Sequence, residues 1–201
     1  MPQYNRGMIK AIIFDCFGVL TNDSWREFLD TLPPGQAVAK ARELNHLYDS
    51  GKLEFREFID QVTSVTGGDR KLIEKIFTHP DHTKNLLLLD YIASLRTRYK
   101  IGVLSNVNRD WIREEFLTPK EQRLFDAYTF SYKVGATKPH PSMYHASLDQ
   151  LGVKPGEAVF VDDVERYVDA ARELGMSGIV YKNFQQMKRE LELLLAAVSD
   201  N

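Results

Sequence analysis

The stretch IKAIIFDCFGVL, residues 9–20, sets a short apolar run directly before an aspartate, Asp15, and a glycine, Gly18. A run of this length, rich in isoleucine and bounded by a turn-forming residue, is typical of a buried strand that ends in a loop. The run is far shorter than the ~20 apolar residues of a membrane span, and Asp15 interrupts it, so we expect neither a transmembrane helix nor a signal peptide. The sequence therefore predicts a first buried strand with Asp15 at its carboxyl end.

From residue 86 onward, helical and strand patterns alternate along the chain. Apolar runs predict strands at residues 101–104, 127–130, 158–161 and 178–181. Apolar residues at helical spacing predict helices at residues 86–99, 109–117, 141–151, 167–174 and 184–198. Strands that alternate with helices indicate an α/β fold, in which helices cover both faces of a parallel sheet.

The segment between the first and second predicted strands has a different texture. In residues 22–84, apolar side chains recur at helical spacing, and Pro33-Pro34, Gly51 and Gly67-Gly68 interrupt the pattern. No strand pattern occurs there, so the segment predicts a small helical bundle. We therefore expect a core domain at residues 1–20 and 86–201 and an inserted helical domain at residues 21–85.

Composition narrows the class of partner. The chain has 201 residues, 43% of them hydrophobic, which is enough for a sizeable core. Its 26 basic and 28 acidic residues give a net charge of −2, whereas nucleic-acid binders usually carry a basic patch or stripe. A single cysteine excludes an internal disulfide framework. We expect a cytoplasmic protein, monomer or homodimer, with a small-molecule partner and neither nucleic acid nor membrane.

Polar residues follow the predicted strands where the strands end. Because ligands of open α/β sheets bind outside the carboxyl ends of the strands, these residues should share one crevice. Three carboxylates in one place repel one another unless a cation is present, and one lysine can offset only part of their charge. A hard divalent ion with oxygen ligands would neutralise the remaining negative charge, and Mg²⁺ is such an ion. The set comprises Asp15, Ser105, Asn106, Lys138, Asp162 and Asp163.

Four short motifs in this order carry a resemblance to a known family. They are the strand followed by Asp15-x-x-Gly18, then Leu104-Ser105-Asn106, then Lys138-Pro139-x-Pro141, then Phe160-Val161-Asp162-Asp163. The chain resembles the haloacid-dehalogenase-like hydrolase superfamily, in its subgroup with a helical cap inserted after the first motif (C1). The resemblance implies a Rossmann-like, doubly wound parallel core, a cap at residues 21–85 and a Mg²⁺-dependent hydrolase.

The resemblance also implies a role for each residue. Asp15 would be the nucleophile and would form a covalent aspartyl intermediate. Ser105 and backbone N–H groups near Asn106 would hold the transferring group, and Lys138 would neutralise Asp15 and the developing charge on the phosphate. The metal would be bound by Asp15, the backbone carbonyl of Phe17 and Asp163, with Asp162 a ligand through water or a competitor for that role.

One residue departs from the family pattern. In most phosphatases of this family a second aspartate stands two residues after the nucleophile and moves the proton of the leaving group, whereas here the residue is Phe17. General acid–base help is worth typically ~10²–10⁴-fold, so a phosphohydrolase with Phe17 needs either a good leaving group, such as an acyl phosphate, or another proton donor, for which Asp23 and Glu54 are candidates.

Three functions stay open at this point. The favoured one is a Mg²⁺-dependent phosphohydrolase that acts on a small phosphorylated metabolite through an aspartyl-phosphate intermediate. The second is a metal-independent 2-haloacid dehalogenase, a class that also carries an aromatic residue at the Phe17 position; Val19 and Asp163 oppose it. The third is a catalytically weakened binding module of the same fold.

Overall fold

The structure is a computed structural model, which describes residues 8–78 and 82–196. Its centre is a sheet of five strands, all parallel, in the order β3-β2-β1-β4-β5. The strands are β1 (Ala11–Phe14), β2 (Lys100–Ser105), β3 (Ala127–Phe130), β4 (Ala158–Asp162) and β5 (Ser177–Val180). Every strand predicted from the sequence is present, and the parallel pairing confirms the α/β prediction.

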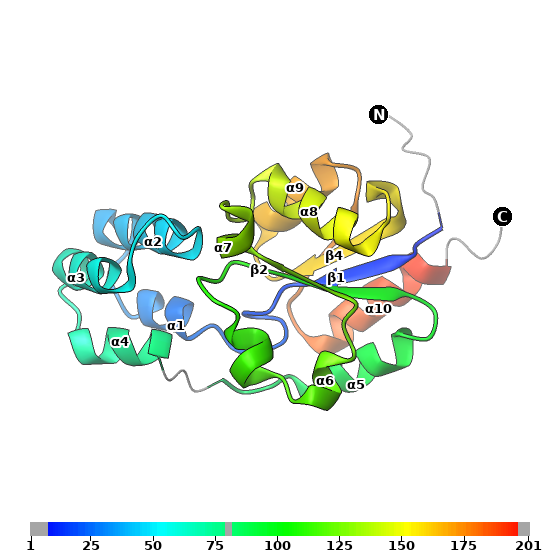
Figure 1. The fold of residues 1–201 in the computed structure, drawn as a ribbon, viewed down its shortest axis with the longest axis horizontal. Helices are drawn as coiled ribbons and strands as arrows, with labels where there is room; N and C mark the ends of the chain where they lie inside the picture. The colour runs from blue at the N-terminus through cyan, green and yellow to red at the C-terminus, as the bar shows by residue number, and fades with distance from the viewer. Residues whose placement is uncertain (1–7, 79–81, 197–201) are drawn as a thin grey trace.

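Helices cover both faces of this sheet (Figure 1). On one face, Ile12 and Phe14 of β1 pack with α5 (Leu86–Leu95) and α10 (Phe184–Ala196). On the other, Ala11 and Ile13 pack with α8 (Pro141–Leu151) and α9 (Glu165–Glu173). Alternate residues of a strand point to opposite faces, so a strand that is apolar at every position is buried on both. This explains why residues 9–14 form an unbroken apolar run.

The segment after β1 is helical, as its spacing predicts. It contains α1 (Ser24–Asp30), α2 (Gln36–Asp49), α3 (Phe55–Thr66) and α4 (Arg70–Thr78). These helices share a hydrophobic cluster of their own, in which Phe58, Ile59 and Val62 are fully buried. They lie beyond the carboxyl ends of the strands (Figure 1).

Both ends of this helical segment meet at one place. Thr21 and Lys84 form an isolated antiparallel bridge, and the Asn85 N–H donates to the Leu20 carbonyl at 2.9 Å. The Asn85 side chain donates to the Val19 carbonyl at 3.0 Å and also caps α5. The chain therefore leaves the core and returns to it through a single paired stem.

Local differences from the predicted helices are confined to connections. The helix expected at residues 109–117 is a short π-helix, η1 (Ile112–Phe116), and that expected at 86–99 ends at Leu95. Three short helices were not predicted: α6 (Pro119–Gln122), α7 (Ser131–Val134) and the 3₁₀ turn η2 (Pro155–Glu157). Within the described residues, no helix combines the length and apolar character needed to span a membrane.

Candidate active site

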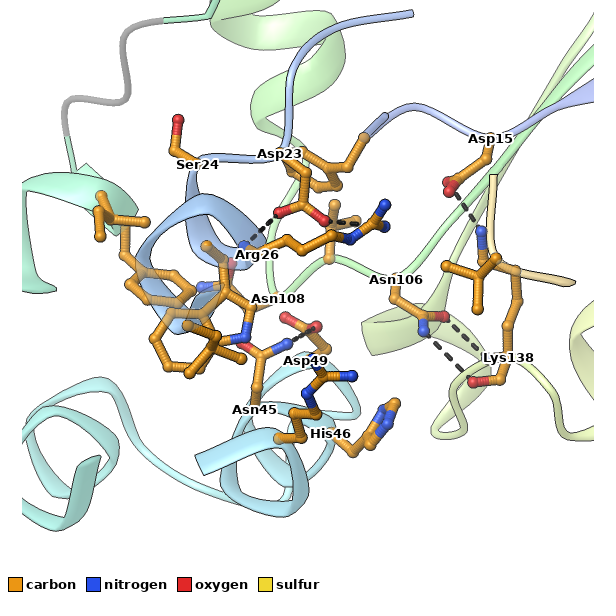
Figure 2. A pocket seen from close by; sticks show the side chains of 18 of the residues that line it. Asp15, Asp23, Ser24, Arg26, Asn45, His46, Asp49, Asn106, Asn108 and Lys138 are labelled. Carbon is orange, nitrogen blue, oxygen red and sulfur yellow. Dashed lines mark hydrogen bonds and ion pairs between the residues drawn. The ribbon is translucent and has the colours of Figure 1, made fainter. Parts of the chain in front are cut away.

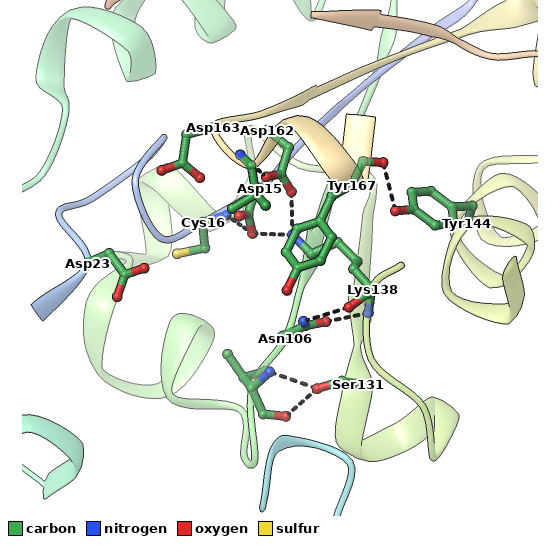
Figure 3. Close-up of polar contacts among 12 residues, drawn as sticks. Asp15, Cys16, Asp23, Asn106, Ser131, Lys138, Tyr144, Asp162, Asp163 and Tyr167 are labelled. Atoms are coloured by element: carbon green, nitrogen blue, oxygen red, sulfur yellow. Dashed lines mark hydrogen bonds and ion pairs between the residues drawn. The ribbon is translucent and has the colours of Figure 1, made fainter. Parts of the chain in front are cut away.

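Three carboxylates converge at the centre of the sheet edge. β1 and β4 are neighbours in the sheet; Asp15 follows β1, Asp162 is the last residue of β4 and Asp163 comes next. Each of the three offers a carboxylate oxygen, and these oxygens lie within 4.8 Å of one another (Figure 3). The chain passes from β3 on one side of β1 to β4 on the other, so this edge is the topological switch point where ligands of such sheets bind.

Lys138 lies between two of these carboxylates. Its Nζ is 2.7 Å from Asp15 Oδ1 and 2.6 Å from Asp162 Oδ2, and the side chain is only 1% exposed. Burial lowers the pKa of Lys138, but the charges of Asp15 and Asp162 outweigh burial and raise the pKa above its ordinary value. The ammonium of Lys138 therefore lies where it can offset the charge of Asp15 and Asp162.

Asn106 holds the backbone of Lys138 in place. Its Oδ1 accepts from the Lys138 N–H at 2.8 Å, and its Nδ2 donates to the Lys138 carbonyl at 3.4 Å (Figure 3). The loop after β2 thereby fixes the loop that carries the lysine. The sequence suggested a phosphate-binding role for the backbone near Asn106, whereas this positioning contact of its side chain was not predicted.

The site carries surplus negative charge in spite of Lys138. Burial, followed by the charges of Asp162 and Asp163, raises the pKa of Asp15 well above its ordinary value, although Lys138 opposes this. Both oxygens of Asp162 are occupied, one by Lys138 and the other by the Val164 N–H at 2.8 Å. By contrast, Asp163 Oδ1 is buried and accepts no hydrogen bond from the described residues. A buried carboxylate oxygen without a donor, next to two other carboxylates, suits a hard divalent cation with oxygen ligands such as Mg²⁺.

The helical segment contributes a cation that sequence reasoning missed. The guanidinium of Arg26, on α1, contacts Asp163 Oδ2 directly and lies 3.1 Å from Asp23 Oδ2. Asp23 also caps α1 by accepting from the Arg26 N–H at 2.9 Å. An Asp–Arg pair at (i, i+3) is the only local signal of this arrangement, and many exposed helices carry such a pair.

Gly18 allows the loop after β1 to approach Asp163. Its φ is +79°, a left-handed conformation that glycine adopts readily. A Cβ at this position would lie 2.1 Å from Asp163 Oδ2, so no other residue fits without displacing the carboxylate. The glycine of the first motif thus keeps Asp163 beside Asp15.

A cavity of about 370 Å³ opens next to these residues, between the strand ends and the helical segment (Figure 2). Asp15, Asn106 and Lys138 line its core side, and Asn45, His46 and Asp49 of α2 line the opposite side. Its volume falls in the range of small-molecule sites. Of the other predicted residues, Phe17 lines the cavity, whereas Ser105, Asp162 and Asp163 are not among its lining residues.

Two of the predicted residues have surroundings that the sequence did not specify. Ser105 ends β2 fully buried, and its Oγ has no hydrogen-bond partner among the described residues. The ring of Phe17 packs against Trp111, with centroids 5.4 Å apart, and against His82, with centroids 5.7 Å apart. Phe17 therefore forms an aromatic part of the wall, where most phosphatases with this motif have a second carboxylate.

A comparison with family models decides the relationship that this geometry suggests. Residues 9–175 match the model for haloacid dehalogenase-like hydrolases. The chain belongs to this family. Its Rossmann-type sheet with flanking helices is the fold of the family, and the protein is a hydrolase.

Phosphatases are among the curated relatives of this haloacid dehalogenase-like hydrolase. The D-ribitol-5-phosphate phosphatase of Bacteroides thetaiotaomicron is 28% identical over 94% of this chain and 99% of its own length. The N-acylneuraminate-9-phosphatase of Rattus norvegicus is 30% identical over 89% of this chain and 75% of its own length.

Solved structures of the family share the same architecture. A predicted haloacid dehalogenase-like hydrolase from Porphyromonas gingivalis superposes with a TM-score of 0.68 at 26% identity, covering 94% of this chain and 98% of its own. A family enzyme from Bacteroides thetaiotaomicron, in complex with magnesium and inorganic phosphate, has a TM-score of 0.60 at 22% identity and covers 87% and 94%. Because its identity is only 22%, this second structural match supports the fold alone.

Proposed function

We propose that this haloacid dehalogenase-like hydrolase is a Mg²⁺-dependent phosphohydrolase that acts on a small phosphorylated metabolite. The observation that carries the proposal is the cluster of Asp15, Asp162 and Asp163 around Lys138, at the inner end of a cavity of small-molecule size. Two curated relatives that span most of the chain are phosphatases of small phosphorylated compounds, which agrees with it.

In this proposal Asp15 is the nucleophile. One of its oxygens attacks phosphorus, the bond to the leaving oxygen breaks, and water then hydrolyses the aspartyl phosphate. The Lys138 ammonium opposes the rise in the pKa of Asp15 that burial causes, and it offsets the charge that develops on the phosphoryl oxygens. Ser105, whose buried hydroxyl has no partner among the described residues, and Asn106 are proposed to bind the phosphoryl group.

Asp15, the Phe17 carbonyl and Asp163 are proposed to hold the Mg²⁺ ion directly. Oδ1 of Asp163, which accepts no hydrogen bond from the described residues, supports this, whereas both oxygens of Asp162 are engaged, so Asp162 is proposed to act through water. A bound Mg²⁺ would neutralise charge on the phosphoryl oxygens and orient them for attack.

The remaining assignments rest on the same reasoning. We propose residues 1–20 and 86–201 as the catalytic core and residues 21–85 as a cap that closes over the cavity and selects the substrate. We also propose that the protein works in the cytoplasm, as a monomer or homodimer, without nucleic-acid or membrane partners.

One observation favours a second candidate, a metal-independent 2-haloacid dehalogenase. Phe17 and Trp111 give the cavity an aromatic wall next to Asp15, and a halide leaves without a proton. Asp163, whose Oδ1 has no hydrogen-bond partner among the described residues, weighs against this candidate, because a site without a metal ion has nothing to neutralise its extra negative charge.

A direct assay distinguishes the two candidates. The purified protein is given p-nitrophenyl phosphate with Mg²⁺ or with EDTA, and separately 2-chloropropionate with EDTA. Phosphatase function predicts hydrolysis of the phosphate that needs Mg²⁺ and is lost in Asp15→Asn. Release of chloride in EDTA, without hydrolysis of the phosphate in Mg²⁺, would establish the dehalogenase instead. Absence of both activities would favour the binding module.

A further inference from the structure

The proposed reaction lacks a proton donor at the usual position, since Phe17 has no proton to give. An alkoxide is a poor leaving group, so hydrolysis of an alkyl phosphate needs an acid within reach of the leaving oxygen. Besides Asp15, the carboxyl groups on the cavity wall are those of Asp23, Asp49 and Glu115. Glu54, a candidate from the sequence, is exposed and does not line the cavity.

Two of these three groups are engaged by arginine. Asp23 accepts from the Arg26 N–H and pairs with the Arg26 guanidinium, which favours its ionised form even though burial raises its pKa. Glu115 is half exposed and lies 2.5 Å from Arg109 Nη1. A carboxyl group that is paired with a cation is a weak acid catalyst because the cation stabilises the deprotonated form.

Asp49 differs from both in its surroundings. It is the last residue of α2 and is only 7% exposed. Within the described residues, its carboxylate accepts one hydrogen bond, from the neutral amide of Asn45 at 2.9 Å, and it contacts no cation. Figure 2 shows Asp49 beside Asn45 and Asn108, across the cavity from Asp15 and Lys138.

The core fixes Asp49 at this position. The Ser131 hydroxyl, directly after β3, lies 2.6 Å from the Asp49 carbonyl oxygen and 2.9 Å from the Val107 carbonyl oxygen, and it accepts from the Val107 N–H at 2.8 Å. The neighbouring Tyr48 hydroxyl accepts from Asn108. Residues of the core therefore hold the end of α2 that carries Asp49, through its backbone carbonyl and through the hydroxyl of Tyr48.

We propose that Asp49 is the general acid and base of the reaction, in the role that the residue at position 17 has in most related phosphatases. This inference rests on the proposed phosphohydrolase function. As Asp15 attacks phosphorus, the bonding pair of the P–O(leaving) bond stays on the leaving oxygen, which takes the proton of Asp49 and departs as an alcohol. The Asp49 carboxylate then accepts a proton from the water that attacks the aspartyl phosphate, which returns Asp15 as a carboxylate and Asp49 as an acid.

The acidity of Asp49 suits this task. Burial raises its pKa to about 7, with a further contribution from Asp23, while the hydrogen bond from Asn45 and the charge of Lys138 oppose the rise. Arg42 and His46 on its own helix, and Arg109 and Arg166 from the core, line the same cavity. A group with a pKa near the working pH is present in both protonation states, as a residue that alternates between acid and base requires.

The dependence of rate on the leaving group tests the proposal. kcat/KM covers all steps through departure of the leaving group, so p-nitrophenyl phosphate, whose phenolate leaves unprotonated, should be hydrolysed by Asp49→Asn with kcat/KM within about 3-fold of the original protein. For ribitol 5-phosphate, an alkyl ester, the same variant should lose ~10²–10⁴-fold. The original protein should lose kcat/KM for the alkyl ester as the pH rises through about 7, because the donor deprotonates, and Asp49→Asn should lack this limb.

Two further variants control for structure. Glu54→Gln removes an exposed carboxylate five residues from Asp49 and should leave kcat/KM unchanged for both substrates. Asp49→Glu keeps a carboxyl group and should recover most of the activity on the alkyl phosphate. A purely structural defect would instead lower kcat/KM for both substrates together.

The outcomes also separate this inference from the proposed function. Equal loss on both substrates, or an unchanged leaving-group dependence, would overturn the role of Asp49 while phosphatase activity itself stands. The role of Asp49 would also be overturned if the original protein hydrolysed the aryl ester but did not hydrolyse the alkyl ester. Absence of all Mg²⁺-dependent hydrolysis in the original protein would overturn the proposed function first.

Discussion

Replacing Lys138 by methionine should reveal how much the buried charge cluster depends on one cation. The variant keeps an unbranched side chain one atom shorter than lysine but leaves two carboxylates, formerly at 2.7 and 2.6 Å from the ammonium, without their partner. Removing one member of a buried ion pair typically costs about 3–5 kcal/mol, because the remaining charge is buried and unpaired. For a chain of 201 residues, each kcal/mol lowers the melting temperature by about 2–4 °C, so we expect a fall of about 6–20 °C.

Urea denaturation in EDTA measures this loss, with Lys40→Met as the matched control. Lys40 is half exposed and pairs with Glu43 at 3.0 Å, and exposed pairs contribute only about 0–1 kcal/mol. The pH dependence gives a second check. Burial and the neighbouring carboxylates raise the pKa of Asp15, so the folded state of Lys138→Met binds more protons than the unfolded state, and its deficit should shrink as the pH falls from 8 to 5. A loss below about 1 kcal/mol, or a deficit that grows on acidification, would refute the reasoning.

Three further changes test other parts of the structure. Gly18→Ala places a Cβ 2.1 Å from Asp163 Oδ2 and should therefore destabilise the protein by more than Gly51→Ala. At Gly51 φ is also positive but no atom lies within 4 Å of the added Cβ, so that control should cost only the backbone strain, about 1–2 kcal/mol. Equal losses of stability in thermal unfolding would contradict the close approach at Gly18. Mg²⁺ at 100 times its Kd should stabilise the protein by about 2.7 kcal/mol, and Asp163→Asn should lack this gain in a thermal-shift titration; an undiminished gain would place the ion elsewhere. Phe58→Ala leaves a cavity at a fully buried position and should cost about 3–5 kcal/mol of stability. Amide hydrogen exchange should then rise first in α1–α4. An equal rise of exchange in the sheet would show that the helices do not unfold separately.

Local sequence patterns predicted the central strands well, because β1 and β4 are buried at every position and are apolar up to the aspartates at their ends. The strand ends then brought Asp15, Lys138 and Asp163 together, since parallel strands present their carboxyl ends at one edge. The order of the strands, however, depends on how helices pack across the sheet, and no single segment encodes it.

The contributions of the helical segment to the site were harder to predict. Arg26 reaches Asp163, and Asp49 reaches the cavity, only because of the angle at which the helices dock on the core. Glu54 lies a few residues from Asp49 in the sequence yet is exposed. Periodicity tells which face of a helix is apolar, but it does not tell which polar residues at its end meet a partner that is distant in the sequence.

The paired stem at Thr21 and Lys84 makes the helical segment replaceable. Since the chain enters and leaves through adjacent residues, the segment between them can lengthen, shorten or be exchanged while the register of the sheet and the positions of Asp15 and Asp163 stay the same. A rigid movement of the helices about this stem would break side-chain contacts such as those of Arg26 and Ser131 and leave the backbone pairing intact. Under the proposed function, a change in this one segment would change the substrate, while the catalytic residues at the strand ends stay the same.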